Sequence, residues 1–285
     1  MFVVVGATGN TGSAVVETLL SKKQPIRVIV RSADKGVAWK AKGVDVAVAS
    51  LDDVSALAQA FAGATGVYLM LPPNYGATAW LSDQQARMDR AAEAVKKGGV
   101  SHLVYLSSVG GQLPNGTGPI RAVHYGEGKL AGAVKHLTIL RPPSFMENWA
   151  PVLGMAKGQG ILPTFVAPNV KIHTISTRDI GRIGAEHLLS GGQGRTVVEL
   201  AGPEEYSADQ AAEALSTILG NKVTTQQSPL SAVVPTYKSF GFSDEAAKLF
   251  EEMYTGFSTG TIGYEFPAKL VRGTVTLSEA LRGMV

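Results

Sequence analysis

The sequence predicts an α/β protein, a Rossmann-type doubly wound parallel sheet with a smaller carboxy-terminal α/β substrate domain. Short apolar runs alternate with helix-like patterns along the first half of the chain, as in parallel sheets covered by helices on both faces. A glycine-rich turn separates the first apolar run from the first helical pattern, as in nucleotide-binding βαβ units. With 285 residues, 45% of them hydrophobic, the chain can bury a large core.

The first strand is predicted at 2–5, and the turn after it, 6–12, reads GATGNTG. Glycine suits a place where the chain turns tightly and a ligand approaches the backbone, because a Cβ hinders both. Free N–H groups at the start of the next helix attract phosphate. The spacing Gly-x-x-Gly-x-x-Gly departs from the commoner Gly-x-Gly-x-x-Gly, so a plain tight turn is the alternative. We expect a dinucleotide to contact Gly6, Thr8, Gly9, Asn10, Thr11 and Gly12.

Five further strands follow on the same pattern. Each is a short apolar run bounded by turn residues, and they are predicted at 26–30, 44–48, 66–71, 103–106 and 137–140. Between the fourth and fifth strands, an amphipathic helix carries Leu81, Met88 and Val95 on related faces and ends at Gly98-Gly99. The six strands predict a doubly wound order.

The second half of the chain departs from this alternation. Prolines interrupt the region after 142, before a strand near 171–175 and a helix beginning near Asp179, whose carboxylate we expect as the N-cap. A strand at 197–200 returns to the sheet, and helices at 207–219 and 243–254 form a smaller cap. We therefore assign residues 1–142, completed by about 171–202, to a dinucleotide-binding Rossmann domain. The substrate-binding part comprises residues 143–170 and 203–285.

The residues after the second strand indicate which cofactor is used. An acidic residue there binds the ribose 2′-hydroxyl of NAD, whereas a cation accommodates the 2′-phosphate of NADP. Val30 is followed by Arg31, Ser32 and, after Asp34, Lys35. Arg31 offers a planar fork for a phosphate, Ser32 a hydroxyl and Lys35 a second charge. NADP (NADPH) is therefore the predicted cofactor, the alternative being a solvated basic corner around Asp34.

Composition excludes several other classes of protein. The chain has no cysteine, which rules out disulfides and thiolate chemistry, and its histidines show no metal-ligand spacing, so no metal is predicted. Its net charge is only +3 and its basic residues are dispersed, so no nucleic-acid partner is expected. No apolar run approaches the length of a membrane span and no leader pattern opens the chain. We expect a cytoplasmic protein without a membrane partner.

Four segments resemble the NmrA-like branch of the atypical short-chain dehydrogenases/reductases, including its NAD(P)H:quinone oxidoreductase-type members. They are the glycine turn, the Val30-Arg31 strand end, the run 106–108 (LSS) and the block 140–148 (LRPPSFMEN). The block is the most specific, because the whole superfamily shares the glycine motif. The resemblance spans nearly the whole chain and implies an NADP-binding Rossmann domain with a small carboxy-terminal substrate domain. Some members of the family reduce quinones, dyes or other small acceptors, and others are redox-sensing regulators.

One segment departs from the family. Many members carry Gly-Asp after the third strand, where this chain has Ala49-Ser50. Asp52 is close by and could supply the missing adenine contact. It could equally cap the helix that contains Leu57 and Phe61.

Three residues have the types of the superfamily's catalytic set, namely Ser108, Tyr125 and Lys129. Residues four apart share a helix face, so Lys129 could lower the pKa of Tyr125 and help it protonate a carbonyl oxygen. Gly126 and Gly128 weaken the helix inside this motif, and relatives often lack the Tyr and carry a His, a position that His124 resembles. Lys129 could instead bind the nicotinamide ribose.

The remaining candidates follow strand ends. The backbone at Leu71 and Pro72 is expected beside the cofactor, because a doubly wound sheet binds its ligand at these carboxyl ends. The family alignment implies cofactor contacts for Pro143 and Phe145, and a substrate wall from Phe145, Met146 and Trp149. Aromatic residues 237, 240, 242 and 254 could form the opposite wall or belong to the core.

These observations predict an NADPH-dependent reductase of a small electron-poor acceptor, with a quinone first. A quinone accepts hydride without a positioned acid, whereas a carbonyl or imine needs one. An NADP(H)-sensing regulator without turnover is the alternative, and a carbonyl or imine reductase using Ser-Tyr-Lys comes third. A monomer or homodimer is expected.

Overall fold

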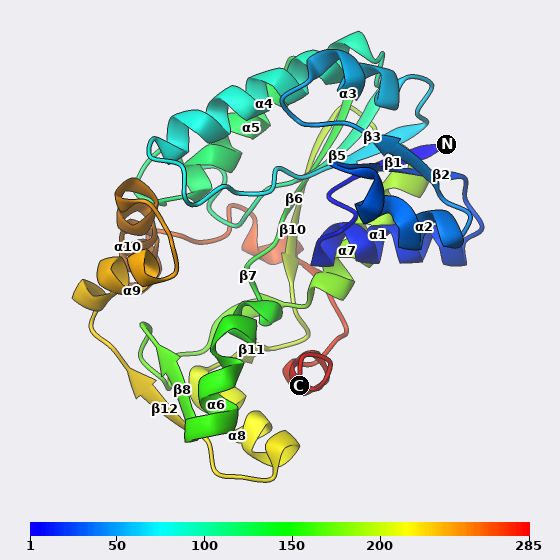
Figure 1. The fold of residues 1–285 in the computed structure, drawn as a ribbon. Helices are drawn as coiled ribbons and strands as arrows, with labels where there is room; N and C mark the ends of the chain where they lie inside the picture. The colour runs from blue at the N-terminus through cyan, green and yellow to red at the C-terminus, as the bar shows by residue number, and fades with distance from the viewer.

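The computed structural model describes all 285 residues, and its centre is an eight-stranded sheet in which every neighbouring pair is parallel (Figure 1). Across the sheet the strands are β13 (Val271–Arg272), β10 (Arg195–Ala201), β6 (His136–Arg141), β5 (His102–Leu106), β4 (Gly66–Leu69), β1 (Phe2–Val5), β2 (Ile26–Val30) and β3 (Asp45–Val48). The order reverses between β1 and β4, which confirms the predicted doubly wound sheet. The return of 197–200 to the sheet, as part of β10, is also confirmed.

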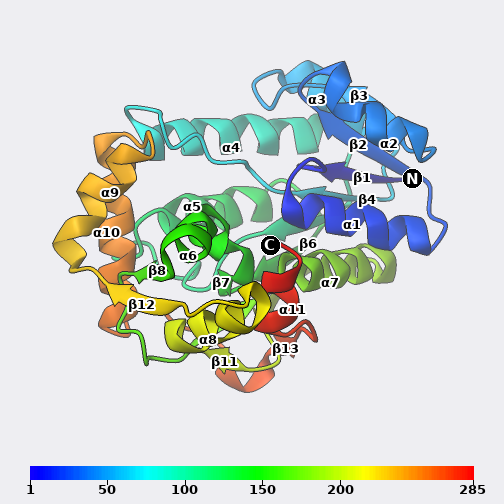
Figure 2. The same cartoon turned by 60° about the horizontal axis from the view of Figure 1, so that its bottom comes forward.

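Helices cover both faces of this sheet. On one face α1 (Asn10–Ser21) and α7 (Thr177–Ser190) lie side by side (Figure 2). The other face carries α3 (Val54–Phe61), α4 (Trp80–Lys97) and α5 (Ile120–Ala131). Successive strand residues alternate between the two cores, so Val3 joins the α4 side and Val4 the α1 side. Because both faces are covered, the strands read as unbroken apolar runs.

The carboxy-terminal part has its own small core around Met146, Leu162 and Leu215. Two small sheets belong to it, β11-β9-β7 and β12-β8. Their strands are β7 (Ser144–Phe145), β8 (Ile161–Thr164), β9 (Ile172–Ile175), β11 (Glu205–Tyr206) and β12 (Thr224–Gln227). The strand predicted near 171–175 thus exists as β9, but it pairs with β7 and β11 and stays outside the large sheet.

Short helices complete the fold. They are α2 (Val37–Ala41), α6 (Leu153–Gln159), α8 (Ala208–Leu219), α9 (Val233–Ser239), α10 (Asp244–Ser258) and α11 (Leu277–Arg282), with 3-10 turns at Ala33–Gly36, Met146–Val152, Leu230–Ala232 and Pro267–Lys269. The helices α8 and α10 match those predicted at 207–219 and 243–254. No helix combines the length and the apolar character that crossing a membrane would require.

The structure places two helix caps at other residues than those considered in the sequence, three residues earlier in α7 and one residue later in α3. The N-cap of α7 is Ser176, whose hydroxyl accepts from Arg178 N. Asp179 lies inside the helix instead, where its buried Oδ2 accepts the N–H groups of Thr274 and Val275, each at 2.8 Å. Helix α3 is capped by Asp53, while Asp52 pairs with Arg90 at 2.6 Å.

Candidate functional site

Two of the three glycines in the turn between β1 and α1 are required by the fold, and the third is not. Gly6 has a φ of +80°, a conformation that glycine adopts readily. A Cβ on Gly12 would lie 2.2 Å from Gly6 O, which is a collision with backbone. A Cβ on Gly9 would meet nothing nearer than Gly6 O at 3.5 Å, an ordinary contact. Space above Gly9 is therefore open, as close approach of a ligand requires.

The first turn of α1 offers unused hydrogen-bond donors. The N-cap residue, Gly9, has no side chain to cap the helix, and no acidic residue lies in the first turn. No acceptor within the protein takes the N–H groups of Asn10, Thr11 or Gly12. Free N–H groups at a helix start bind phosphate, because the helix dipole adds to their partial positive charge. The turn thus fits the pyrophosphate of a dinucleotide.

The cationic corner lies on the adjacent strand, at the carboxyl end of β2. The side chain of Arg31 is exposed and makes neither an ion pair nor a hydrogen bond. Lys35 is 3.8 Å from Asp34, and a hydrogen bond from Ser32 lowers the pKa of that carboxyl group. Arg31 is therefore the cation of this corner that has no partner within the protein, and it is free to meet a phosphate.

The structure does not bring Ser108 together with Tyr125 and Lys129. The Tyr125 hydroxyl contacts both carboxylate oxygens of Asp89 on α4, at 2.9 and 3.0 Å, and Lys129 Nζ is 2.9 Å from the same carboxylate. Hydrogen bonding to Tyr125 and then to Asp89 raises the pKa of Lys129. The Ser108 side chain makes no hydrogen bond. Its neighbour Ser107 instead donates to Glu127 at 2.6 Å.

The orientation of α5 has a simple cause. A Cβ on Gly126 would lie 2.4 Å from the hydroxyl oxygen of buried Tyr105, so glycine lets this face of α5 approach the sheet. Tyr125 and Lys129 lie on the adjoining stripe, which meets α4. In this structure Tyr125 and Lys129 therefore form a contact between α5 and α4 and do not meet Ser108. His124, the other candidate on α5, binds Gly111 O through Nδ1 at 2.8 Å.

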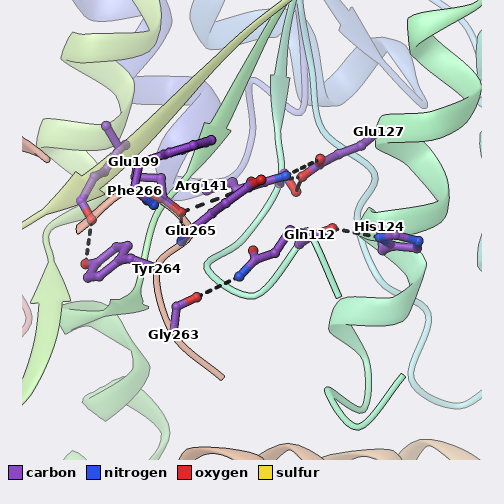
Figure 3. Close-up of polar contacts among 12 residues, drawn as sticks. Gln112, His124, Glu127, Arg141, Glu199, Gly263, Tyr264, Glu265 and Phe266 are labelled. Atoms are coloured by element: carbon purple, nitrogen blue, oxygen red, sulfur yellow. Dashed lines mark hydrogen bonds and ion pairs between the residues drawn. The ribbon is translucent and has the colours of Figure 1, made fainter. Parts of the chain in front are cut away.

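Figure 3 shows a buried ionic network that the sequence reasoning missed. Arg141, at the end of β6, is 2% exposed and binds Glu127 through Nε at 2.8 Å and Nη2 at 2.7 Å. Its Nη1 binds Glu265 and lies 4.0 Å from Glu199. These carboxylates keep the pKa of Arg141 high despite the opposing effect of burial. The sequence signal that could have revealed this network is Arg141 itself, a single charged residue at the end of the apolar run of β6.

The residues of the 140–148 block separate into core and partly exposed positions. Met146 is fully buried in the carboxy-terminal core. In this structure its side chain packs in that core and lines no open wall, and its predicted contact with a substrate stays a prediction. Phe145 and Trp149 are half-buried, and Pro143 is buried. After β4, Leu71 packs partly against the core, and Pro72 O accepts from Arg87 Nη1 at 2.8 Å.

An aromatic cluster lies between the loop after β4 and helices α9 and α10. Tyr75 stacks on Phe242 with ring centroids 4.4 Å apart, and Tyr237 stacks on Phe250 at 4.5 Å. The hydroxyl groups of Tyr237 and Tyr254 are 3.0 Å apart, and Phe165 packs on Tyr254. Phe240 remains 59% exposed. Most of the aromatic residues predicted as core or wall therefore pack on one another.

A doubly wound parallel sheet with a glycine turn and free N–H groups between β1 and α1 defines a dinucleotide-binding protein of the Rossmann class. Comparison with known families then places it more narrowly. The model of the NmrA-like family matches residues 1–265, so the chain belongs to that family.

Two relatives span most of the chain. It is 27% identical to an NAD(P)H azoreductase of Xenophilus azovorans over 258 residues, which cover 89% of this chain and 86% of that protein. It is 28% identical to quinone oxidoreductase 2 of Escherichia coli (strain K12) over 290 residues, 99% of this chain and 97% of that protein. The enzyme class predicted from the sequence agrees with the names of both relatives.

Solved structures agree on the fold. The NADPH-dependent quinone oxidoreductase of Escherichia coli in complex with NADPH has a TM-score of 0.83 and 26% identity, over 100% of this chain and 99% of that one. A triphenylmethane reductase of Citrobacter sp. complexed with NADP(H) has a TM-score of 0.82 at 20% identity, over 100% of this chain and 99% of that one. The second likeness concerns the fold alone.

Proposed function

We propose that this protein is an NADPH-dependent reductase of a small, planar, electron-poor acceptor, with quinones as the first class to test. The single observation that carries the proposal is the pairing of two unused groups at adjacent strand ends. The N–H groups of residues 10–12 have no acceptor in the protein, and Arg31 has no partner. A dinucleotide phosphate and a 2′-phosphate would satisfy these groups. Two relatives named as a quinone oxidoreductase and an azoreductase support the acceptor class.

In this proposal the cofactor is held by the residues predicted from the sequence. The turn Gly6–Gly12 would hold the pyrophosphate through backbone N–H groups, and Arg31 with Ser32 the 2′-phosphate. Residues after β4 and β6, namely Leu71, Pro72, Pro143 and Phe145, would line the rest. The bound cofactor supplies the hydride, and the protein supplies orientation and shielding from water.

A quinone fits the arrangement of α5 better than a carbonyl does. A carbonyl reductase needs a proton donor beside the forming alkoxide, whereas hydride transfer to a quinone can be followed by protonation from water. Tyr125 is hydrogen-bonded to Asp89, and Ser108 is joined to neither Tyr125 nor Lys129. No positioned Ser-Tyr-Lys set is present, so an acceptor that can do without a positioned acid is favoured.

The proposal is tested by following NADPH absorbance with a panel of para-quinones, azo and triphenylmethane dyes, aldehydes and ketones, without added flavin or metal. Saturable oxidation with quinones, and little with aldehydes, is expected. Gly9→Val is the control for contaminating reductases, because the backbone at residue 9 has room for a Cβ while the added side chain would occupy the proposed pyrophosphate site. If NADPH binds tightly and no acceptor raises oxidation above this control, the regulator that senses NADP(H) replaces the reductase.

A further inference from the structure

A short strap crosses the carboxyl ends of β6 and β10. It comprises residues 262–266, which connect α10 to β13, and Figure 3 shows it running past Arg141. Tyr264 OH donates to Leu200 O at 2.7 Å. The N–H groups of Glu265 and Phe266 donate to the two carboxylate oxygens of Glu199 at 2.8 and 2.7 Å. Polar contacts thus hold residues 264–266 to the sheet, and the ring of Tyr264 also packs on that of His173.

The strap also covers the loop that follows β5. Gln112 Nε2 donates to Gly263 O at 3.0 Å, and the buried side chain of Ile262 packs with Val109 and Ile120. This loop carries Ser108 and lies at the carboxyl edge of the sheet, where doubly wound folds bind their ligands. Movement of the strap would therefore change access to the acceptor side of the proposed site.

The charges around Arg141 are unbalanced, and its carboxylate partners differ in exposure. Two cations, Arg141 and Arg195, meet three carboxylates, those of Glu127, Glu199 and Glu265. The Glu127 side chain is 3% exposed and binds Arg141 through two hydrogen bonds, whereas that of Glu265 is 39% exposed. Glu265 can therefore become hydrated when it leaves, while Glu127 continues to neutralise Arg141.

We propose that the 262–266 strap is a hinged cover over the loop after β5, and that the Glu265–Arg141 ion pair is its latch. Opening breaks the contact of Glu265 with Arg141, the two N–H bonds to Glu199, and the hydrogen bonds of Tyr264 and Gly263, and it exposes residue 262. Loss of both donors to the buried Glu199 carboxylate is the cost that keeps the strap closed at rest. The residues on either side of the strap, 259–261 and 267–269, are exposed, and their hydrogen bonds lead only to α10, to Phe266 or to one another, so they can move with the strap. The latch rests on contacts within the chain, and only the identity of what it admits rests on the proposed function.

Hydrogen exchange of the full-length protein tests the latch. The amides of Glu265 and Phe266 are protected by Glu199 and so report the closed strap. Glu265→Gln should speed their exchange about tenfold, as expected for loss of a charge-assisted contact that is partly solvated. The matched control is Glu93→Gln, which removes an exposed ion pair with Lys97 on α4. Equal exchange at these amides in Glu265→Gln and Glu93→Gln would overturn the proposal.

A second measurement uses the absence of cysteine from the chain. In an Ile262→Cys variant the single thiol is shielded while the strap is closed, so alkylation reports opening. Adding Glu265→Gln should raise the alkylation rate about tenfold, and adding Glu93→Gln should not. Strap opening without acceptor-dependent NADPH oxidation would refute the proposed function and leave the cover standing. Acceptor-dependent turnover with unchanged exchange and alkylation rates in Glu265→Gln would refute the cover and leave the proposed function standing.

Discussion

Arg31→Ala should remove most of the preference for NADPH over NADH. Arg31 has no ion pair or hydrogen bond within the protein, so its loss should leave the fold and the thermal midpoint unchanged. A charge-assisted hydrogen bond contributes about 1.5 to 3 kcal/mol, and the exposure of Arg31 favours the lower figure. NADPH should then bind roughly tenfold more weakly, because about 1.4 kcal/mol is a factor of ten in Kd. NADH has no 2′-phosphate, so its affinity should stay the same.

The assay is a titration of both cofactors by calorimetry or protein fluorescence at low and at physiological salt. Salt should reduce the NADPH preference, because an exposed charge pair is screened. Arg282→Ala is a matched control, since Arg282 is an exposed arginine of α11 that also makes no ion pair. If the unmutated protein binds NADPH and NADH equally, or if Arg31→Ala weakens both alike, the reasoning about the end of β2 is refuted.

Four further predictions test other parts of the structure. Gly9→Val should weaken the binding of both NADPH and NADH without lowering the thermal midpoint. Gly12→Ala should destabilise the fold, because its Cβ would lie 2.2 Å from Gly6 O, and melting curves distinguish the two variants. Tyr125→Phe should keep quinone reduction within about tenfold, and a loss of several hundredfold in kcat would restore the Ser-Tyr-Lys mechanism. Arg141→Met should cost about 3 to 5 kcal/mol in urea unfolding, because buried Glu127 then keeps only Ser107 Oγ at 2.6 Å and Arg195 at 3.5 Å. Adding Glu127→Leu should recover part of this loss. Burial, followed by the charges of His136 and His187, lowers the pKa of His102 below its ordinary 6.5. The stability that neutral His102 contributes is therefore full above that pH and is lost as the pH falls. His102→Asn should reduce the change of the urea midpoint between pH 7 and pH 5, and an unchanged pH dependence would count against this assignment.

The sheet could be predicted from the sequence because its signals are local. Each strand is a continuous apolar run, and the glycine turn and the cationic residues at 31 and 35 immediately follow strand ends. The placement of Asp52 and Asp179 was missed, because neighbouring Asp53 and Ser176 are equally good caps. Sequence patterns rarely decide between adjacent cap residues.

The polar contacts of the site could not be predicted in the same way. The direction of Tyr125 depends on how closely α5 approaches Tyr105, which is a matter of packing between a helix and a strand. Arg141 joins residues 127, 199 and 265, which are far apart in the chain and carry no common spacing. Met146 looked like a wall residue because the family block contains it, yet its side chain fills the carboxy-terminal core.

The position of β13 has a consequence for how the edge of the sheet is protected. Leu200 of β10 pairs with Val271, and Asp179 receives N–H groups from Thr274 and Val275, which lie near the end of the chain. Whenever residues 271–275 are detached, the sheet has an open edge at β10, and the buried carboxylate of Asp179 lacks these two donors. An open strand edge invites pairing with other chains. Docking of residues 271–275, rather than formation of the glycine turn, is therefore the step that covers this edge of the sheet.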